Sequence, residues 1–202
     1  FALVVGRGGY TFCPATFKNG KRSKDNFEQQ QMFALDFDNK DPNRRVSLEE
    51  VKARAKKYDL PILFAYDTFS STDHDKFRVV FLNDVSISHR RIVEAMQLAL
   101  GTIFPEADKS CYTDSARMFF GGKGLIYYDD TIPTINVESI FRGLTYFLRD
   151  TTGNHYKEKL SKFSRETGIA LNKKGLLDVT MTDDPTESLG ATPSTQDGKI
   201  SP

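Results

Sequence analysis

Apolar side chains alternate with other residues in a segment near the N-terminus and predict a β-strand over residues 32–38. Successive side chains of a strand point to opposite faces, so Phe33, Leu35 and Phe37 share one face. Asp36 lies on the other face. Segments of similar β-prone composition predict three further strands, over residues 62–66, 76–81 and 117–120.

Helical spacing of apolar residues appears in the segments between and after these strands. Ser47 and Glu50 form a capping-box pattern that predicts a helix ending near Tyr58. Ile92, Met96 and Ala99 form the buried stripe of a second predicted helix. The four predicted helices cover residues 47–58, 88–101, 140–148 and 156–167.

Strands and helices in this order indicate an α+β fold. We expect residues 1–179 to form one domain, which is long enough to be a catalytic domain. From residue 180 the chain consists largely of Thr, Ser, Asp, Pro and Gly, so we expect residues 180–202 to form a linker or disordered tail. The first residue is Phe rather than Met, and we expect the chain to be a fragment of a longer protein.

Composition restricts the classes of function. The 202 residues are 39% hydrophobic and include 16 Phe, which is ample material for one core. The net charge of +1, from 28 basic and 27 acidic residues, means that any basic surface must be local. Two distant cysteines and three histidines argue against zinc sites and disulfide frameworks. No apolar run approaches the ~18 residues of a membrane span, and we expect a cytoplasmic protein.

The acids of the first predicted strand are the first candidate site. Asp36 and Asp38 lie on the same strand face with Cα atoms roughly 7 Å apart. Two neighbouring carboxylates repel each other unless a cation lies between them, so replacing both by Asn should not lower stability. Oxygen ligands of this kind suit Mg²⁺ or Mn²⁺. An isolated Asp-x-Asp is more often a solvated strand end. The metal-site hypothesis therefore depends on further acidic and basic residues elsewhere in the chain.

Cations and a third acid occur at places that suit a triphosphate substrate. Lys76 and Arg78 share one face of a predicted strand, and Asp114 precedes Arg117 in a turn. Metals held by carboxylates activate an attacking hydroxyl, while Lys and Arg neutralise the charge on pyrophosphate. A basic loop before the acidic strand is a candidate contact for a nucleic-acid backbone; its residues are Lys18, Lys21 and Arg22.

Three motifs in this order resemble the archaeo-eukaryotic primase superfamily. They are Asp-Phe-Asp at 36–38, Lys-Phe-Arg-Val-Val-Phe-Leu at 76–82 and Asp-Ser-Ala-Arg-Met-Phe-Phe-Gly-Gly at 114–122. The resemblance covers about residues 10–125 and is greatest with the primase-polymerases of plasmids, phages and mobile elements. It implies an RRM-like mixed or antiparallel sheet with flanking helices, arranged as two sheets with the active site between them.

The resemblance also implies a set of roles. Asp36, Asp38 and Asp114 would be the catalytic metal ligands for Mg²⁺ or Mn²⁺. The substrates would be nucleoside triphosphates on a single-stranded DNA template, and a helicase domain is an expected partner in the longer protein. Ribo- and deoxyribonucleotides, and priming and extension, all stay open.

The family's second motif, a Ser-x-His that contacts the nucleotide phosphates, is missing here. By strand register Arg78 takes the place of that histidine, and we rank it above His74 in the preceding loop. Further candidates for nucleotide binding are Lys76, Arg117 and Lys123. Lys123 is not part of a Walker A loop, because Gly124 stands where Ser or Thr is needed.

Two alternatives remain. A metal-dependent glycosyltransferase also uses Asp-x-Asp, although nothing in the sequence indicates a sugar pocket. A non-catalytic module that stacks single strands on exposed aromatic residues would account for the Phe content. It would leave the three acids without a purpose, because acids repel phosphates unless metals lie between them.

Overall fold

The computed structural model describes residues 1–112 and 114–181. Its main feature is a five-stranded sheet in the order β1-β2-β4-β3-β5, in which every pairing of neighbouring strands is antiparallel. The strands are β1 (Ala15–Phe17), β2 (Phe27–Phe37), β3 (Phe64–Thr68), β4 (Phe77–Ile87) and β5 (Gly122–Tyr128). The expected α+β class and flanking helices are confirmed.

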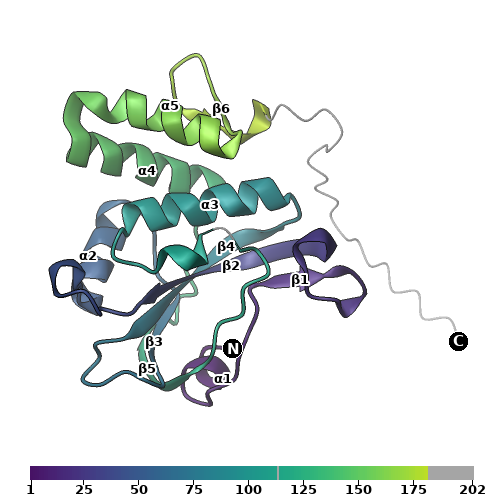
Figure 1. Ribbon diagram of the computed structural model, residues 1–202, viewed down its shortest axis with the longest axis vertical. Helices are drawn as coiled ribbons and strands as arrows, with labels where there is room; N and C mark the ends of the chain where they lie inside the picture. The colour runs from purple at the N-terminus through teal and green to yellow at the C-terminus, as the bar shows by residue number, and fades with distance from the viewer. Residues whose placement is uncertain (113, 182–202) are drawn as a thin grey trace, which may run out of the picture.

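Helices cover this sheet in layers (Figure 1). The five α-helices are α1 (Ala2–Gly6), α2 (Leu48–Lys57), α3 (Arg90–Ile103), α4 (Val137–Thr152) and α5 (Tyr156–Thr167). Helix α3 packs on β2 and β4, α4 packs on α3, and α5 packs on α4. Short 3-10 turns, at Lys18–Gly20, Lys24–Asn26, Pro42–Arg44, Lys109–Cys111, Gly153–His155 and Val179–Met181, connect or end these elements.

The four helices predicted from spacing are all present, with ends that shift by a few residues. Helix α2 begins with the predicted capping box: the Ser47 hydroxyl accepts from the Glu50 amide, and the Glu50 carboxylate accepts from the Ser47 amide. In α3 the predicted stripe of Ile92, Met96 and Ala99 is buried. These features depend on contacts within a few residues, which is why the sequence reveals them.

Strand predictions were right in the centre of the sheet, but neither edge strand, β1 or β5, was predicted. Residues 117–120 do not form a sheet strand; Phe119 makes an isolated bridge with Phe12 instead. The edge strand is β5, which begins at Gly122 and pairs with β3. A side chain at Gly122 would place its Cβ 2.2 Å from the carbonyl oxygen of Asp67, so only glycine permits this pairing.

A second expectation, an active site between two sheets, is not met by the described residues. The second sheet consists only of β6 (Ala170–Leu171) and β7 (Leu177–Asp178), a small hairpin after α5. Most of the predicted tail, residues 182–202, lies outside the described residues; Val179–Met181 form a 3-10 turn. Within the described ranges, no helix is long and apolar enough to cross a membrane.

The two faces of the main sheet have different covers. Phe37 and Phe77 stack with ring centroids 5.0 Å apart, and on the same face Phe81 meets Phe104, which follows α3, at 6.0 Å. The opposite face is covered by α1 and by the bridged Phe12 and Phe119, whose rings stack at 5.6 Å. The acid Asp36 belongs to this second face.

Candidate active site at the end of strand β2

The predicted acid pair lies where β2 ends. Phe33, Leu35 and Phe37 are fully buried, whereas Asp36 and Asp38 are half-buried, as the alternation predicts. β2 ends at Phe37, so Asp38 already belongs to the following loop. The sequence therefore places two carboxylates at one end of a central strand with its apolar residues beneath them.

Asp36 is opposite Arg78 in the pairing of β2 with β4. The Arg78 guanidinium donates to the Asp36 carboxylate at 2.9 Å, and the two side chains are only 10% and 16% exposed. Arg78 also donates to the backbone carbonyl of Phe120, and Tyr66 donates its hydroxyl to the same oxygen at 3.0 Å. Arg78 is thus held inside the sheet face by two acceptors, with little surface left for a ligand.

Asp38 has a different environment. Its carboxylate contacts Lys40, whose side chain is 77% exposed. The hydrogen bond to Asp38 raises the pKa of Lys40 above its usual value. Because this pair faces solvent, it is easily opened by a competing cation or by a phosphate.

A further acid that sequence reasoning missed lies beside this strand end. The Asp108 amide donates to the Asp36 carbonyl at 2.8 Å, on the edge of β2 that does not face β4. Burial raises the pKa of Asp108, but hydrogen bonds from Ser110 outweigh it and hold this pKa below its usual value. The sequence pattern Asp-x-Ser at Asp108 and Ser110 indicates a turn. It does not indicate that this turn contacts β2.

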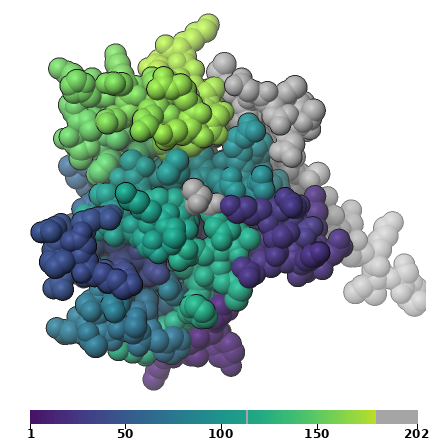
Figure 2. Space-filling model, viewed as in Figure 1, coloured from purple at the N-terminus to yellow at the C-terminus, as the bar shows by residue number. Residues whose placement is uncertain are grey.

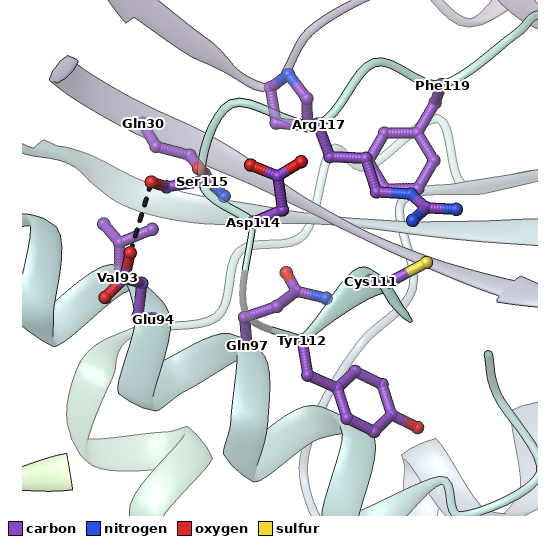
Figure 3. Close-up of a pocket in the computed structure, with 11 residues that line it drawn as sticks. Gln30, Val93, Glu94, Gln97, Cys111, Tyr112, Asp114, Ser115, Arg117 and Phe119 are labelled. Atoms are coloured by element: carbon purple, nitrogen blue, oxygen red, sulfur yellow. Dashed lines mark hydrogen bonds between the residues drawn. The ribbon is translucent and has the colours of Figure 1, made fainter. Parts of the chain in front are cut away.

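Asp114 lies in an exposed turn, where its carboxylate accepts from the Ala116 amide at 3.1 Å. With Gln97, Cys111, Ser115 and others it lines a small pocket of about 20 Å³, room for about one water molecule (Figure 3). Neither Asp36 nor Asp38 lines this pocket. Its size excludes a nucleotide.

Arg117 and Arg22 tie the Asp114 turn to its surroundings. Arg117 donates to the Ser110 hydroxyl at 2.8 Å and lies 3.6 Å from the Asp108 carboxylate. Arg22, from the predicted basic loop, donates to the Ala116 carbonyl at 2.7 Å. Lys18 and Lys21 of that loop are exposed. The structure thus brings one end of the basic loop to the third acidic motif.

His74 is an exposed member of the predicted nucleotide ligands. Its side chain is 67% exposed, and its Nδ1 lies 2.7 Å from a carboxylate oxygen of Asp67, which is itself buried. Ser71 donates to the other Asp67 oxygen at 3.2 Å. Lys76 precedes the first residue of β4, and Lys123 contacts the Ser71 carbonyl, so both lie near this loop.

An open pocket of about 450 Å³ lies between the loop that carries His74 and the loop that follows Asp38. The residues that line it are Asn39, Arg45, Val46, Ser47, Glu50, Thr72, His74 and Asp75. This volume is within the range of small-molecule sites. The pocket therefore provides space for a nucleotide beside the end of β2, which the sequence did not reveal.

The carboxylates suit a divalent cation in donor type but are not gathered into a ligand cluster. Among residues 1–112 and 114–181, no three His, Cys, Asp or Glu side chains are placed to hold one metal ion. Asp36 and Asp38 each contact a cationic side chain instead. A shared site of Asp36, Asp38 and Asp114 stays a prediction.

Comparisons with known proteins leave the family open. No family model matches the chain, and no curated protein matches it either. Among solved structures, it is similar to the AEP domain of the cyanophage S-2L primase-polymerase (PrimPol). The similarity has a TM-score of 0.45 and 11% sequence identity, over 64% of this chain and 68% of that one. At this level no residue role is transferred from that structure.

Proposed function

We propose that this chain catalyses template-dependent nucleotidyl transfer, as a primase or polymerase that uses Mg²⁺ or Mn²⁺. The observation that carries the proposal is the end of β2. Asp36 and Asp38 lie there, and Asn39, the residue after Asp38, lines an open pocket of about 450 Å³ together with His74. Acids alone would repel a triphosphate, and a metal-dependent reaction gives them a purpose.

The acids at the end of β2 and the arginine beside them would have different roles in the reaction. Asp36 and Asp38 would hold the metal, which supplies charge neutralisation and a more acidic attacking hydroxyl when bound. Arg78 would orient Asp36, because it is anchored to that carboxylate and to the Phe120 carbonyl. Whether Asp108 or Asp114 adds a third carboxylate is decided by separate Asn variants of each.

For contact with the triphosphate, we rank His74 above Arg78, which reverses the ranking that strand register favours. Arg78 is 9% exposed, and both terminal nitrogens of its guanidinium already donate hydrogen bonds within the protein. His74 is exposed, and Asp67 orients its ring. His74, Lys76 and Lys123 are therefore the proposed phosphate contacts. The partners are a single-stranded DNA template and nucleoside triphosphates.

Primer synthesis on a single-stranded template tests the proposal. The assay compares ribo- with deoxyribonucleotides, Mg²⁺ with Mn²⁺, and each with a chelator. Asp38→Asn should abolish synthesis while leaving the melting temperature unchanged. Asp59→Asn is a matched control, since Asp59 is an exposed acid paired with Arg142 on another surface. Full synthesis by Asp38→Asn, or synthesis without a divalent ion, would exclude this mechanism.

The same protein preparation separates the alternatives. A glycosyltransferase would hydrolyse nucleotide-sugars with Mn²⁺ and make no primer. A non-catalytic module would bind single strands in a chelator and make no primer under any condition.

A further inference from the structure

Three large aromatic side chains are exposed although they belong to segments far apart in sequence. Tyr10 is 67% exposed, Phe69 61% and Phe120 67%. Single exposed apolar residues are ordinary, but exposed aromatic residues that gather in one place are informative. We call Tyr10, Phe69 and Phe120 the aromatic patch.

Glycines bring these three segments together at the level of the backbone. A Cβ at Gly121, next to Phe120, would lie 2.3 Å from the backbone of Gly9 and 2.6 Å from the Tyr10 nitrogen. A Cβ at Gly9 would lie 2.7 Å from the Phe69 ring. The segments of Tyr10 and Phe120 therefore meet through their backbones, and the Phe69 ring covers Gly9, so the three segments are held close to one another.

The aromatic patch is joined to the candidate active site. The Phe120 carbonyl accepts from Arg78, and Arg78 pairs with Asp36 at 2.9 Å. Helix α1, which ends four residues before Tyr10, packs beside β3 and β5 (Figure 1). In the space-filling view, N-terminal residues form the lower end of the molecule next to blue and teal segments (Figure 2). A ligand lying on the patch at Phe120 would be near the Arg78–Asp36 pair.

Cations border the aromatic patch. Arg7 is exposed and lies two residues before Gly9, which the Phe69 ring covers. Lys123 is exposed and contacts the Ser71 carbonyl, two residues after Phe69. Flat apolar faces with bordering positive charges match bases linked by phosphates.

We infer that the aromatic patch is the surface on which single-stranded nucleic acid stacks its bases, with Arg7 along its phosphates and Lys123 between the nucleic-acid strand and the triphosphate. The inference names the partner surface of the proposed function and rests on it in choosing nucleic acid over protein. Paired bases in a duplex hide their faces, so a stacking surface selects single strands.

The test measures binding of a fluorescent single-stranded oligonucleotide of about 20 nucleotides by fluorescence anisotropy. The buffer contains a metal chelator and no nucleotides. Tyr10→Ala, Phe69→Ala and Phe120→Ala should each weaken binding by roughly 5- to 100-fold, as loss of one base–aromatic stack predicts. Tyr10→Phe should retain affinity because it retains the ring. Tyr128→Ala and Tyr146→Ala are matched controls, since these tyrosines are 48% and 46% exposed elsewhere. Circular dichroism confirms that each variant is folded.

Several results would overturn the inference. These are unchanged affinity in all three variants, equal losses in the controls, tighter binding of duplex than of single strands, and self-association that the patch variants abolish. The last would make the patch an interface between copies of the chain. Because binding is measured without metal or nucleotide, failure of synthesis with intact patch-dependent binding would reject the proposed function alone. Synthesis with an unchanged template KM in the patch variants would reject the patch alone.

Discussion

At the scale of single residues, the decisive pair is Asp36 and Arg78. A buried ion pair costs desolvation on both sides, and removing one partner leaves the other charge uncompensated. The two acids of the Asp-x-Asp motif therefore differ in what they do for stability. Asp36 is part of the interior of a sheet face, whereas Asp38 pairs with exposed Lys40.

This difference leads to a new prediction in place of the expectation that removing both acids does not lower stability. Asp36→Asn should lower the free energy of unfolding by about 1–3 kcal/mol, because Arg78 loses a charged acceptor. Asp38→Asn should change it by less than about 0.5 kcal/mol, as surface changes usually do. Urea denaturation of the two single variants measures both values. Equal effects would show that the Arg78 pair adds nothing.

A second prediction distinguishes the role of His74 in nucleotide binding from the structural role of Arg78. His74→Ala should raise the KM for nucleotide roughly 10- to 100-fold, the worth of a hydrogen bond to a charged group of about 1.5–3 kcal/mol. It should leave stability unchanged, because His74 is exposed. Arg78→Ala should instead destabilise the fold, since Asp36 loses its charged donor and the Phe120 carbonyl keeps only the Tyr66 hydroxyl. A stable Arg78→Ala with a raised nucleotide KM would restore the ranking from strand register.

At the scale of elements, local and long-range causes can be told apart. Helix α2 is determined by its own capping box, whereas β5 depends on how closely it can approach β3. The misplaced strand at 117–120 follows from this: Phe119 forms a bridge with Phe12 rather than joining the sheet.

The capping box gives a prediction with a defined pH dependence. Ser47→Ala should cost about 0.5–2 kcal/mol of stability. Hydrogen bonds from Ser47 lower the pKa of Glu50, so its contribution is present above the ordinary glutamate pKa and is lost as pH falls through the lowered value. Glu50→Gln should therefore be less stable than wild type at pH 7, and the difference should shrink as pH falls below the ordinary glutamate pKa. A difference that persists at low pH would assign the effect to packing.

Two glycines of β5 test the close approach of the strands. Gly122→Ala should destabilise by about 2 kcal/mol or more, because its Cβ would meet the Asp67 carbonyl at 2.2 Å. Gly124→Ala is the matched control, since its nearest neighbour is the Asp67 carboxylate at 4.0 Å. Thermal unfolding of both variants measures the contrast, and similar melting temperatures would contradict it.

At the scale of the whole molecule, one core supports the site. The sheet, α3, α4 and α5 bury a continuous set of apolar residues that ends with Leu160, Phe163 and Ile169. The loops that carry the candidate chemistry extend from this core at residues 38–47, 69–76, 105–112 and 114–121.

Removal of residues 182–202 is the prediction at this scale. The segment contains few apolar residues to bury, so the free energy of unfolding and primer synthesis should both be unchanged. Unfolding by urea and the primer assay are compared for the two lengths. A lower midpoint for the shorter chain would show that these residues contact the core.

The sequence by itself determined what depends on near neighbours. The helix periods, the Ser47–Glu50 box and the alternation that leads to Asp36 and Asp38 all repeat over a few residues, so each can be read without knowing the fold. The α+β class follows from their order.

Only the tertiary structure decided which distant residues meet. The register of β2 with β4 makes Arg78 the partner of Asp36, and a backbone hydrogen bond places Asp108 beside the same strand. The pocket by His74 forms between two loops whose separation in sequence carries no pattern. These contacts depend on strand register and on the close packing that glycine permits, and neither leaves a periodic signal along the chain.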